Sequence, residues 1–544
     1  MVSLFSSLNI ATGALKVNES AISVVSHNVA NMNTEGYSKQ RVNLQARNIA
    51  GAIGDNVEAQ IRSNGGVKIA NVMRYNNEYL NNYYRTQLSD LGKFGSQLSN
   101  LEDLADIFDD LDGDGISGAL SAFFDAVNNL QQYPASATAR TNFLESAKTL
   151  SFVFNSKSTQ LDELNSKALG DGYSEDSLRN SKIYVQYSAF NDKLEELAAV
   201  NKALQVTQTG SLEANNLLDK RDLILNEISE FSDITIREKQ NGTVDLYIGD
   251  AAVVKGSKVV GKLEIQTAQQ FKDYCDSQGI PLPDGFILPD GSFRENAVVS
   301  ISGDETNVLY GNEIITGGSL GGLLHSADLD ADGMNAGIAK KNLNNLAAAV
   351  ADIFNTLNKR EGAYHINPDD STKLSNEDMK DIFATSDGST TVTAANIQVN
   401  SDMLTDKGMW YISCAYFDDP HNYDENAVGN AQNVIQMLDI RHEHLNGQEL
   451  YPGYNLPDLD GMSLEDYYTS MVGKIAAGGS NAQNLVDTQQ DIVDSLYNQI
   501  KASNSVDLNE ELVDLVKYQT AYSAAAQVFN VVNSCLDTLM SLGR

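Results

Sequence analysis

Apolar residues recur at alternating steps of four and three along both ends of this chain of 544 residues. This spacing places them along one side of a helix, in a narrow seam that is typical of helices that wind around a partner. Because such a seam needs another helix to cover it, we expect the two ends to pack together and to leave apolar surface for neighbouring subunits. The seams comprise Leu4, Leu8, Ala11, Leu15, Asn18, Ile22, Val25, Val29 and Met32 at one end, and Leu508, Leu512, Leu515, Gln519, Tyr522, Ala526, Phe529, Asn533, Leu536 and Met540 at the other.

Two asparagines fall on these seams, and each has two interpretations. Asn18 and Asn533 either set the register of a coiled interface, as a buried asparagine does in coiled coils, or they lie at exposed positions beside the seam. The spacing alone leaves both interpretations open. Cys535 lies in the same C-terminal stretch, and we expect it to be buried as a small apolar residue.

Charge and length limit the classes of function. A net charge of −35 argues against binding to nucleic acid, which needs Lys and Arg to displace counterions, and it disfavours anionic membrane surfaces. We expect no membrane insertion, because no run approaches the ~18 apolar residues of a membrane-spanning helix. Residues 1–15 lack a basic region and a continuous apolar core, so we expect no conventional secretory signal. Cys275, Cys414 and Cys535 are far apart and give no sign of a metal site or another cofactor.

The internal pattern predicts a mainly α chain with β-rich insertions, of the α+β class. Helical spacing dominates before Phe231, and strand-like alternation begins at Ile234 around an Asn241-Gly242 pair, which is a strong hairpin signal. We expect an N-terminal coiled-coil helix (1–36), an extended connector (37–75), a helical bundle body (76–231), an inserted β-rich module (232–316), a return helix of the bundle (317–362), a second mixed α/β insertion (363–458), a further helical body (459–505) and a C-terminal coiled-coil helix (506–544).

Two acidic stretches match the opening of a calcium-binding loop. They are Asp110, Asp112 and Asp114 before Gly115, and Asp328, Asp330 and Asp332 before Gly333. A calcium loop of this type needs a bidentate Glu at its twelfth position, and these positions hold Ser121 and Ala339. We therefore expect acidic turns that precede helices, with weak calcium binding by a secreted adhesin as the alternative.

Three further motifs have formal matches to catalytic or ligand sites. Gly317-Gly-Ser319-Leu-Gly321 fits a hydrolase nucleophile motif, for which Asp328 and His365 could complete a triad. We expect a glycine turn into a helix instead, because no alternating β-α framework surrounds it. The Gly113-x-Gly115-x-x-Gly118 pattern formally fits a dinucleotide-binding motif, but it follows an acidic helical segment and not the strand that this motif needs. His442-Glu443-His444 lacks the spacing that places two histidines on one face of a helix to bind zinc, so we expect a surface turn.

The two ends resemble the common start and finish of flagellar rod, hook and hook-associated proteins. The start is Ser26-His-Asn-Val-Ala-Asn-Met-Asn-Thr-Glu-Gly-Tyr-Ser-Lys-Gln, and the finish is Val506-Asp-Leu-Asn-Glu-Glu-Leu with Tyr518-Gln-Thr-Ala-Tyr and Ala525-Ala-Gln-Val. Three internal stretches resemble the hook-associated protein 1 family within this group. They are Phe123-Phe-Asp-Ala-Val-Asn-Asn-Leu with Tyr133, Pro134 and Arg140, Asn216-Leu-Leu-Asp-Lys-Arg-Asp-Leu before the hairpin, and Gly317-Gly-Ser-Leu-Gly-Gly-Leu-Leu. The resemblance covers about residues 1–255, 311–362 and 460–544, but not the insertions at 256–310 and 363–458.

This resemblance implies a structural, non-enzymatic protein of the extracellular flagellum at the junction between hook and filament. It implies export through the flagellar type III channel without a cleaved signal, and a cytoplasmic chaperone that covers the C-terminal helix. The implied partners are further copies of the chain, the hook protein and the next hook-associated protein. Polymerisation would use the apolar seam residues of both ends. The alternatives are a hook or other hook-associated axial protein and, more remotely, a secreted hydrolase that uses Ser319.

Overall fold

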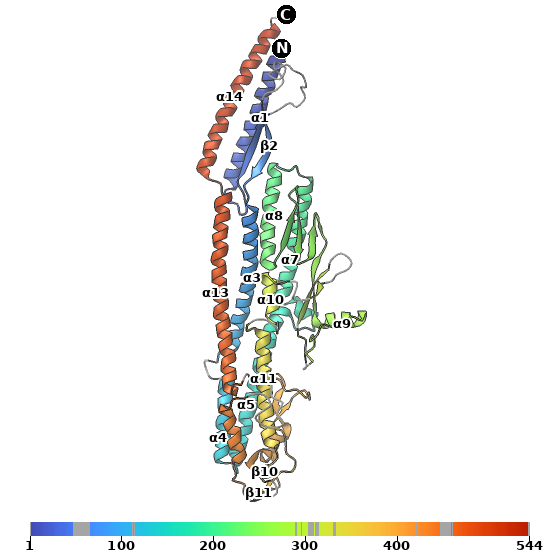
Figure 1. Ribbon diagram of the computed structural model, residues 1–544, viewed down its shortest axis with the longest axis vertical. Helices are drawn as coiled ribbons and strands as arrows, with labels where there is room; N and C mark the ends of the chain where they lie inside the picture. Colours follow the sequence, from blue (N-terminus) through green and yellow to red (C-terminus); the bar gives the residue numbers. More distant parts are fainter. Residues whose placement is uncertain are drawn as a thin grey trace.

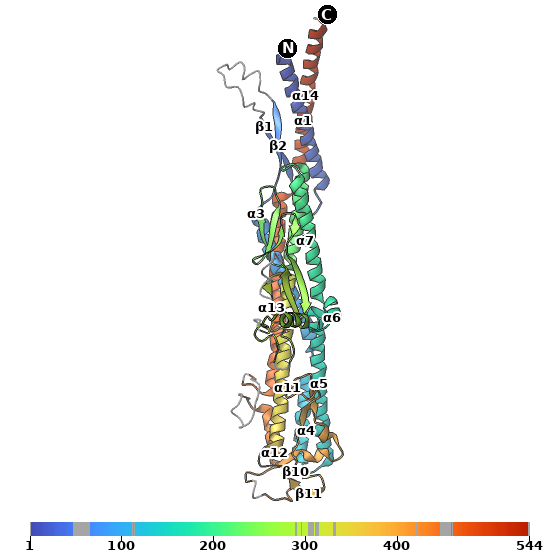
Figure 2. The same ribbon diagram turned by 90° about the vertical axis from the view of Figure 1, so that its right-hand side faces the viewer.

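The computed structural model shows an elongated molecule with both ends of the chain at the same tip (Figure 1). It describes residues 2–46, 66–110, 113, 115–288, 291–294, 296–302, 309–310, 315–329, 333–419, 423–445, 459 and 461–541. Long helices run roughly along the long axis, and small antiparallel sheets are attached beside them (Figures 1 and 2). The structure thus confirms the predicted α+β class.

The tip is formed by the first and the last helix of the chain, which lie side by side. Helix α1 (Val2–Asn31) packs along α14 (Leu508–Ser541), and a hairpin of β1 (Gln40–Ala46) and β2 (Val67–Arg74) lies against α1. The hairpin pairs Gln40 with Arg74 and lies in the segment that we predicted as an extended connector. Below, "terminal helix pair" means α1 and α14.

The middle of the molecule is a helical bundle with the first β insertion on one side. Its helices are α3 (Glu78–Ile107), α6 (Glu175–Arg179), α7 (Lys182–Val206), α8 (Leu212–Phe231), α10 (Gly318–His325) and the upper part of α13 (Leu464–Asn504). Serine hydroxyls cap several of them: Ser211 accepts a hydrogen bond from Ala214 N at the start of α8. A buried apolar cluster joins α7, α8 and α10 to the first β insertion.

The first β insertion holds two antiparallel sheets. The predicted Asn241-Gly242 turn connects two paired strands, with Glu238 opposite Val244 and Gly242 at a φ of 80°. The strands and the one helix described there are β3 (Thr235–Glu238), β4 (Val244–Ile248), β5 (Ala251–Lys255), β6 (Lys258–Val259), β7 (Lys262–Thr267), α9 (Ala268–Gln278), β8 (Ala297–Ser302) and β9 (Leu309–Tyr310).

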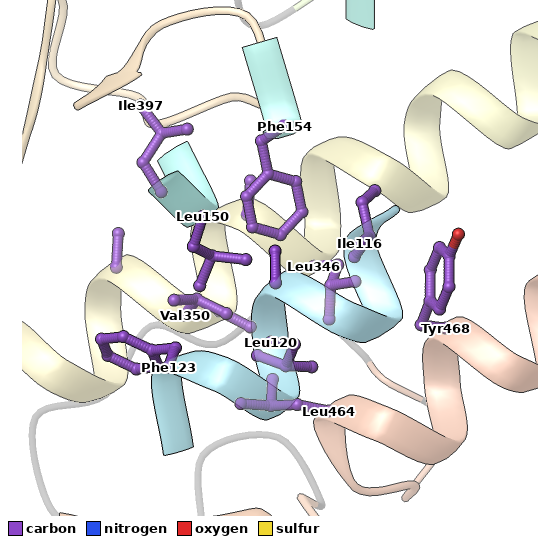
Figure 3. Close-up of a cluster of buried hydrophobic side chains, with 14 of the residues drawn as sticks. Ile116, Leu120, Phe123, Leu150, Phe154, Leu346, Val350, Ile397, Leu464 and Tyr468 are labelled. Atoms are coloured by element: carbon purple, nitrogen blue, oxygen red, sulfur yellow. The ribbon is translucent and has the colours of Figure 1, made fainter. Parts of the chain in front are cut away.

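The lower end contains the largest apolar core. Phe123 is fully buried in it, with its ring centroid 4.8 Å from that of Phe354 and 5.3 Å from that of Phe143. Figure 3 shows Phe123 with other side chains of this core, among them Leu120, Leu346 and Val350. The elements here are α4 (Ile116–Gln132), α5 (Ala137–Leu169), α11 (Ala336–Lys359), β10 (Ala363–Asn367), β11 (Asp370–Ser375), β12 (Phe383–Thr385), β13 (Ile397–Val399), η1 (Ser401–Leu404), η2 (Gly408–Tyr411), β14 (Ser413–Tyr416), α12 (Gln432–Asp439) and η3 (Ile440–His442). The second insertion thus packs on the bundle through this core.

Candidate assembly interface

The terminal helix pair encloses a small apolar cluster close to the body. Ala21, Val24 and Val25 of α1 are buried against Val42 of the hairpin and Tyr518 of α14. Toward the tip, most inward-facing side chains are half-buried rather than buried. The pair therefore covers part of the apolar surface of each helix and leaves the rest uncovered.

The structure places the predicted seam of α1 mostly at the edge of this contact. Ala11 and Val25 are buried, whereas Leu4, Leu8, Leu15, Ile22 and Val29 are half-buried. The most buried line runs instead through Ala11, Val17, Ala21, Val24 and Asn28. The seam and the intramolecular contact are thus neighbouring faces of one helix.

The predicted seam of α14 is divided between the inside and the outside. Leu515, Ala526, Phe529 and Leu536 are half-buried, and Leu508, Leu512, Tyr522 and Met540 are exposed. The buried positions of this helix are Glu511, Tyr518 and Val532, which the seam does not include. The exposed members remain available to another chain.

A second apolar line on α14, which the sequence reasoning missed, faces outward. We call it the outer stripe: Val513, Val516, Thr520, Ala524, Val528, Val531, Cys535 and Leu539. All eight side chains are exposed, with Val513 at 67% and Val531 at 63%. The same steps of three and four relate its members, so the signal was present in the sequence beside the first seam.

Cys535 and Asn533 of α14 are both exposed, whereas Asn18 of α1 is half-buried. Cys535 is exposed, so the expectation that it is buried was wrong, because the face of α14 that packs on α1 lies elsewhere on the helix. Asn533 is also exposed, in agreement with the second of its two interpretations. Asn18 is half-buried and donates a hydrogen bond to Ala14 O of its own helix, at 2.9 Å.

Two acidic residues of the calcium-like loops, Asp110 and Asp328, lie in the described part of the chain, and both have side-chain partners. Asp110 accepts a hydrogen bond from the Tyr468 hydroxyl and lies 3.7 Å from Lys157 Nζ. Asp328 lies 3.9 Å from Arg294 Nη2. Asp112, Asp114, Asp330 and Asp332 lie outside the described residues. Across the described part of the chain, no group of three or more His, Cys, Asp or Glu side chains could hold a metal ion.

The structure does not bring the hypothetical hydrolase triad together. Ser319 lies in α10, and α11, a helix of 24 residues or about 36 Å, separates it along the chain from His365 in β10 (Figure 1). Both ring nitrogens of His365 lie within hydrogen-bond distance of backbone carbonyls, those of Ile366 and Glu377. This arrangement gives Ser319 no base from His365.

The glycines around Ser319 allow close helix packing. Gly318 has a φ of 68°, and a Cβ built there would lie 2.1 Å from the carbonyl carbon of Phe231. A Cβ on Gly322 would lie 2.5 Å from Lys93 O. Because only glycine fits both contacts, this run admits α10 between α3 and α8.

The other formal motifs also lie in structural surroundings. Gly115 precedes α4, and the segment before it is α3 rather than a strand. His442 ends η3, and His444 Nδ1 lies 3.1 Å from Gly461 O. Among the described residues, none of the helices is both long enough and apolar enough to cross a bilayer.

Comparison with known protein families identifies three matching regions. Residues 101–367 match "Flagellar hook-associated protein FlgK helical domain". Residues 8–37 match "Flagella basal body rod protein", and residues 500–542 match "Flagellar basal body rod FlgEFG protein C-terminal". The rod-family matches therefore coincide with the terminal helix pair, and the FlgK match covers most of the bundle.

Curated relatives align with nearly the whole chain. Flagellar hook-associated protein 1 of Bacillus subtilis is 26% identical over 550 residues, which cover 99% of each chain. The proteins of the same name from Salmonella typhimurium and Escherichia coli are 24% and 22% identical, over 98% of this chain and 99% of theirs.

A solved structure, that of the flagellar hook junction protein FlgK from Burkholderia pseudomallei, has the same fold with a TM-score of 0.54. It is 12% identical in sequence, and the match covers 78% of this chain and all of that one. From its two terminal signatures, its central domain and its full-length relatives, the chain belongs to the flagellar hook-associated protein 1 family.

Proposed function

We propose that this protein is a structural, non-enzymatic component of the flagellum that polymerises through its terminal helix pair and forms the junction between hook and filament. The membership in the hook-associated protein 1 family supports the place in the flagellum. The FlgK helical-domain match favours a hook-associated protein over the hook protein itself.

The observation that carries the proposal is the outer stripe of α14. A helix that is apolar on two faces needs two partners, and within the chain α1 covers one face. Fully burying a Val or Leu side chain contributes about 1.5–3 kcal/mol. Because the Val and Leu side chains of the outer stripe are between 46% and 67% exposed, each would contribute roughly 1 kcal/mol when a neighbour covers it.

The interface would combine the outer stripe with the predicted seam positions that remain uncovered. Leu508, Leu512, Tyr522 and Met540 on α14 are exposed beside it. On α1, the half-buried Leu4, Leu8, Leu15, Ile22 and Val29 border the same contact. Neighbouring copies of the chain would cover these positions, with the hook protein on one side and the next hook-associated protein on the other.

The same uncovered surface suggests what happens before assembly. A cytoplasmic chaperone would mask α14 until export through the flagellar type III channel, after which the protein would reside in the extracellular flagellum. A net charge of −35 would keep free subunits apart and soluble. Helices gain most of their stability from packing, so a neighbour that covers α14 would stabilise the terminal helix pair further.

A matched pair of substitutions on the outer stripe tests the proposal. Val531→Asp places a carboxylate where a neighbour would bury an apolar side chain, and Asn530→Asp adds the same charge at an adjacent exposed position. We expect Val531→Asp to reduce incorporation into flagella at least tenfold in a strain that lacks its own copy, and Asn530→Asp to assemble almost normally. Both chains should keep the helical content of the wild type.

Removal of residues 508–544 is the coarser test. We expect a soluble, folded body that does not assemble, because the buried cores of the bundle lie elsewhere. A truncated chain that still assembles, or a Val531→Asp chain that assembles as well as the wild type, would contradict the proposal.

A further inference from the structure

Three connecting segments of the chain lie together where the terminal helix pair meets the body. They are the turn between α1 and β1, the connection from β2 to α3 and the connection from α13 to α14, and backbone hydrogen bonds join them. Lys39 N donates to Asn504 O at 2.9 Å, and Tyr75 N donates to Lys39 O at 2.9 Å. The three segments therefore form one joint below the terminal helix pair (Figure 1).

Asn28 is the polar centre of this joint. Its side chain is fully buried, and Nδ2 donates to Gln40 O at 2.8 Å and to Glu511 Oε2 at 2.9 Å. Its Oδ1 accepts from Gln40 N at 3.0 Å and from the Tyr37 hydroxyl at 2.7 Å. Asn28 thus uses both donors and both acceptor positions of its amide, and ties α1, the hairpin and α14 together.

A cluster of buried ions fixes the body side of the joint. Asp222 of α8 accepts from Arg74, Arg85 and Arg221, and Asp219 accepts from Arg74 Nε at 2.7 Å. Burial alone would raise the pKa of the Asp222 carboxyl, but the three guanidinium groups hold it well below its ordinary value. Asp222 is therefore charged at neutral pH, and the cluster connects the end of β2 to α3 and α8.

Gln40 connects the amide centre to α8. Its Oε1 accepts from Asn215 Nδ2 at 3.0 Å, and its Nε2 donates to Asn216 Oδ1 at 3.1 Å. Lys39 Nζ adds ion pairs to Glu510 and Glu511 at the start of α14, at 2.6 and 3.3 Å. One continuous polar network therefore runs from α14 to the body.

Apolar packing contributes little across this joint. Of the described body residues, only the half-buried Leu212 belongs to the apolar cluster of the terminal helix pair. This cluster is separate from the apolar clusters of the body. Hydrogen bonds depend on direction, whereas apolar contact does not. A joint made of buried hydrogen bonds and ion pairs can therefore hold one angle.

We infer that Asn28, Gln40, Glu511 and the Asp222 cluster are positioning residues, which fix the direction of the terminal helix pair relative to the body. The consequence for assembly rests on the proposed function: a fixed direction presents the outer stripe to a neighbouring copy in one orientation.

The length of α14 makes the direction of the terminal helix pair measurable, because a small rotation at the joint moves the far end of the helix by several ångströms. Cys535 lies about 36 Å beyond Glu511 along the helix at a rise of about 1.5 Å per residue. A rotation of about 10° at the joint would therefore move Cys535 by roughly 6 Å. Cys535 is an exposed thiol, and Cys275 and Cys414 are buried, so one native position accepts a spin label.

The test uses the full chain with a second label at the exposed position Lys202→Cys of α7. Pulsed electron resonance then gives the distribution of distances between Cys535 and residue 202. We expect a narrow distribution for the wild type and for Asn18→Ala, in which the lost hydrogen bond lies within α1. We expect Asn28→Ala to broaden the distribution by at least 6 Å, with unchanged helical content. Glu511→Gln, whose amide oxygen still accepts from Asn28, should stay narrow.

The outcomes separate the inference from the proposed function. A broad distribution in the wild type, or one that Asn28→Ala leaves narrow, overturns the inference whatever the chain does in the flagellum. If Asn28→Ala broadens the distance distribution but assembles as well as Asn18→Ala, the fixed direction of the terminal helix pair is not needed for assembly. A broadened Asn28→Ala chain that assembles at least tenfold less well than Asn18→Ala supports both.

Discussion

Arg140 is a buried charge that attaches the second insertion to the bundle. Its side chain is fully buried in α5, and its partners are carbonyl oxygens and a thiol rather than a carboxylate. Nε donates to Pro134 O at 2.8 Å, Nη1 donates to Ile412 O at 2.8 Å and to Met409 O at 3.2 Å, and Nη2 donates to Cys414 Sγ at 3.1 Å. One side chain thus holds η2 and β14 against the bundle.

The substitution Arg140→Met keeps an unbranched apolar side chain in place of the aliphatic part of the arginine and removes the donors. The carbonyls of Pro134 and Ile412 then lose their shortest contacts from this side chain, and each unsatisfied buried carbonyl costs about 1–3 kcal/mol. The loss of a buried charge offsets part of this cost. We expect a net destabilisation of about 3 kcal/mol in the second insertion, which corresponds to more than a 100-fold increase in its local opening.

Hydrogen exchange measured by mass spectrometry reports this opening directly. Peptides that contain β14 should exchange at least 100 times faster in Arg140→Met, and peptides from α7 and α8 should be unchanged because another core holds them. Arg179→Met is the matched control, because Arg179 is an exposed arginine paired with Glu175 of its own helix. If β14 exchanges at the same rate in Arg140→Met and in the control, the reasoning is refuted.

Three further predictions follow from single positions. Gly318→Ala should destabilise the middle of the molecule by about 2–4 kcal/mol, seen in thermal unfolding, because the new Cβ meets the backbone of Phe231. Gly479→Ala should instead stabilise α13 by about 0.5–1 kcal/mol in the same measurement, because nothing lies within 4 Å of the new Cβ. Lowering the pH from 7 to 5 should leave the ion pairs of Asp222 in place, so label distances that broaden in this range would report protonation of Asp219, whose pKa is raised by burial. The depressed pKa of Asp222 means that its stabilisation is complete above the ordinary Asp pKa of about 3.9, and is lost only as the pH falls through the lower folded value.

Controls separate these effects from general damage. Gly249→Ala has a positive φ of 52° but open space around the new Cβ, so it should destabilise less than Gly318→Ala. Equal losses for both would show that the contact with Phe231 is unimportant. A joint that loosens between pH 7 and 5 would show that groups other than Asp222 control it.

Local patterns predicted much of the secondary structure, because the cause lies in the chain itself. The seam of residues 4–32 predicted a helix, and α1 ends at Asn31. The Asn241-Gly242 pair predicted a hairpin at the place where it occurs, because the turn needs a residue that tolerates positive φ. The change from helical to strand-like spacing near Phe231 likewise marks the end of α8.

The face that each terminal helix buries depends on the partner helix, and spacing does not reveal it. On α14 two apolar lines lie side by side, and α1 covers neither of them completely. Glu511 is buried on this helix, while Leu512 next to it is exposed. No hydrophobicity pattern selects a glutamate for burial, because its burial depends on Asn28, which lies 483 residues away in the chain.

By itself, then, the sequence determined most of the long helices, the Asn241-Gly242 hairpin turn and the family, since these depend on spacing, turn chemistry and recognisable terminal signatures. The tertiary structure decided which polar residues could be buried. Asn28, Asp222 and Arg140 are tolerated in the interior because distant segments supply hydrogen-bond partners for each of them. Those partners come together only when the chain folds, so the joint and the attachment of the second insertion are properties of the three-dimensional structure.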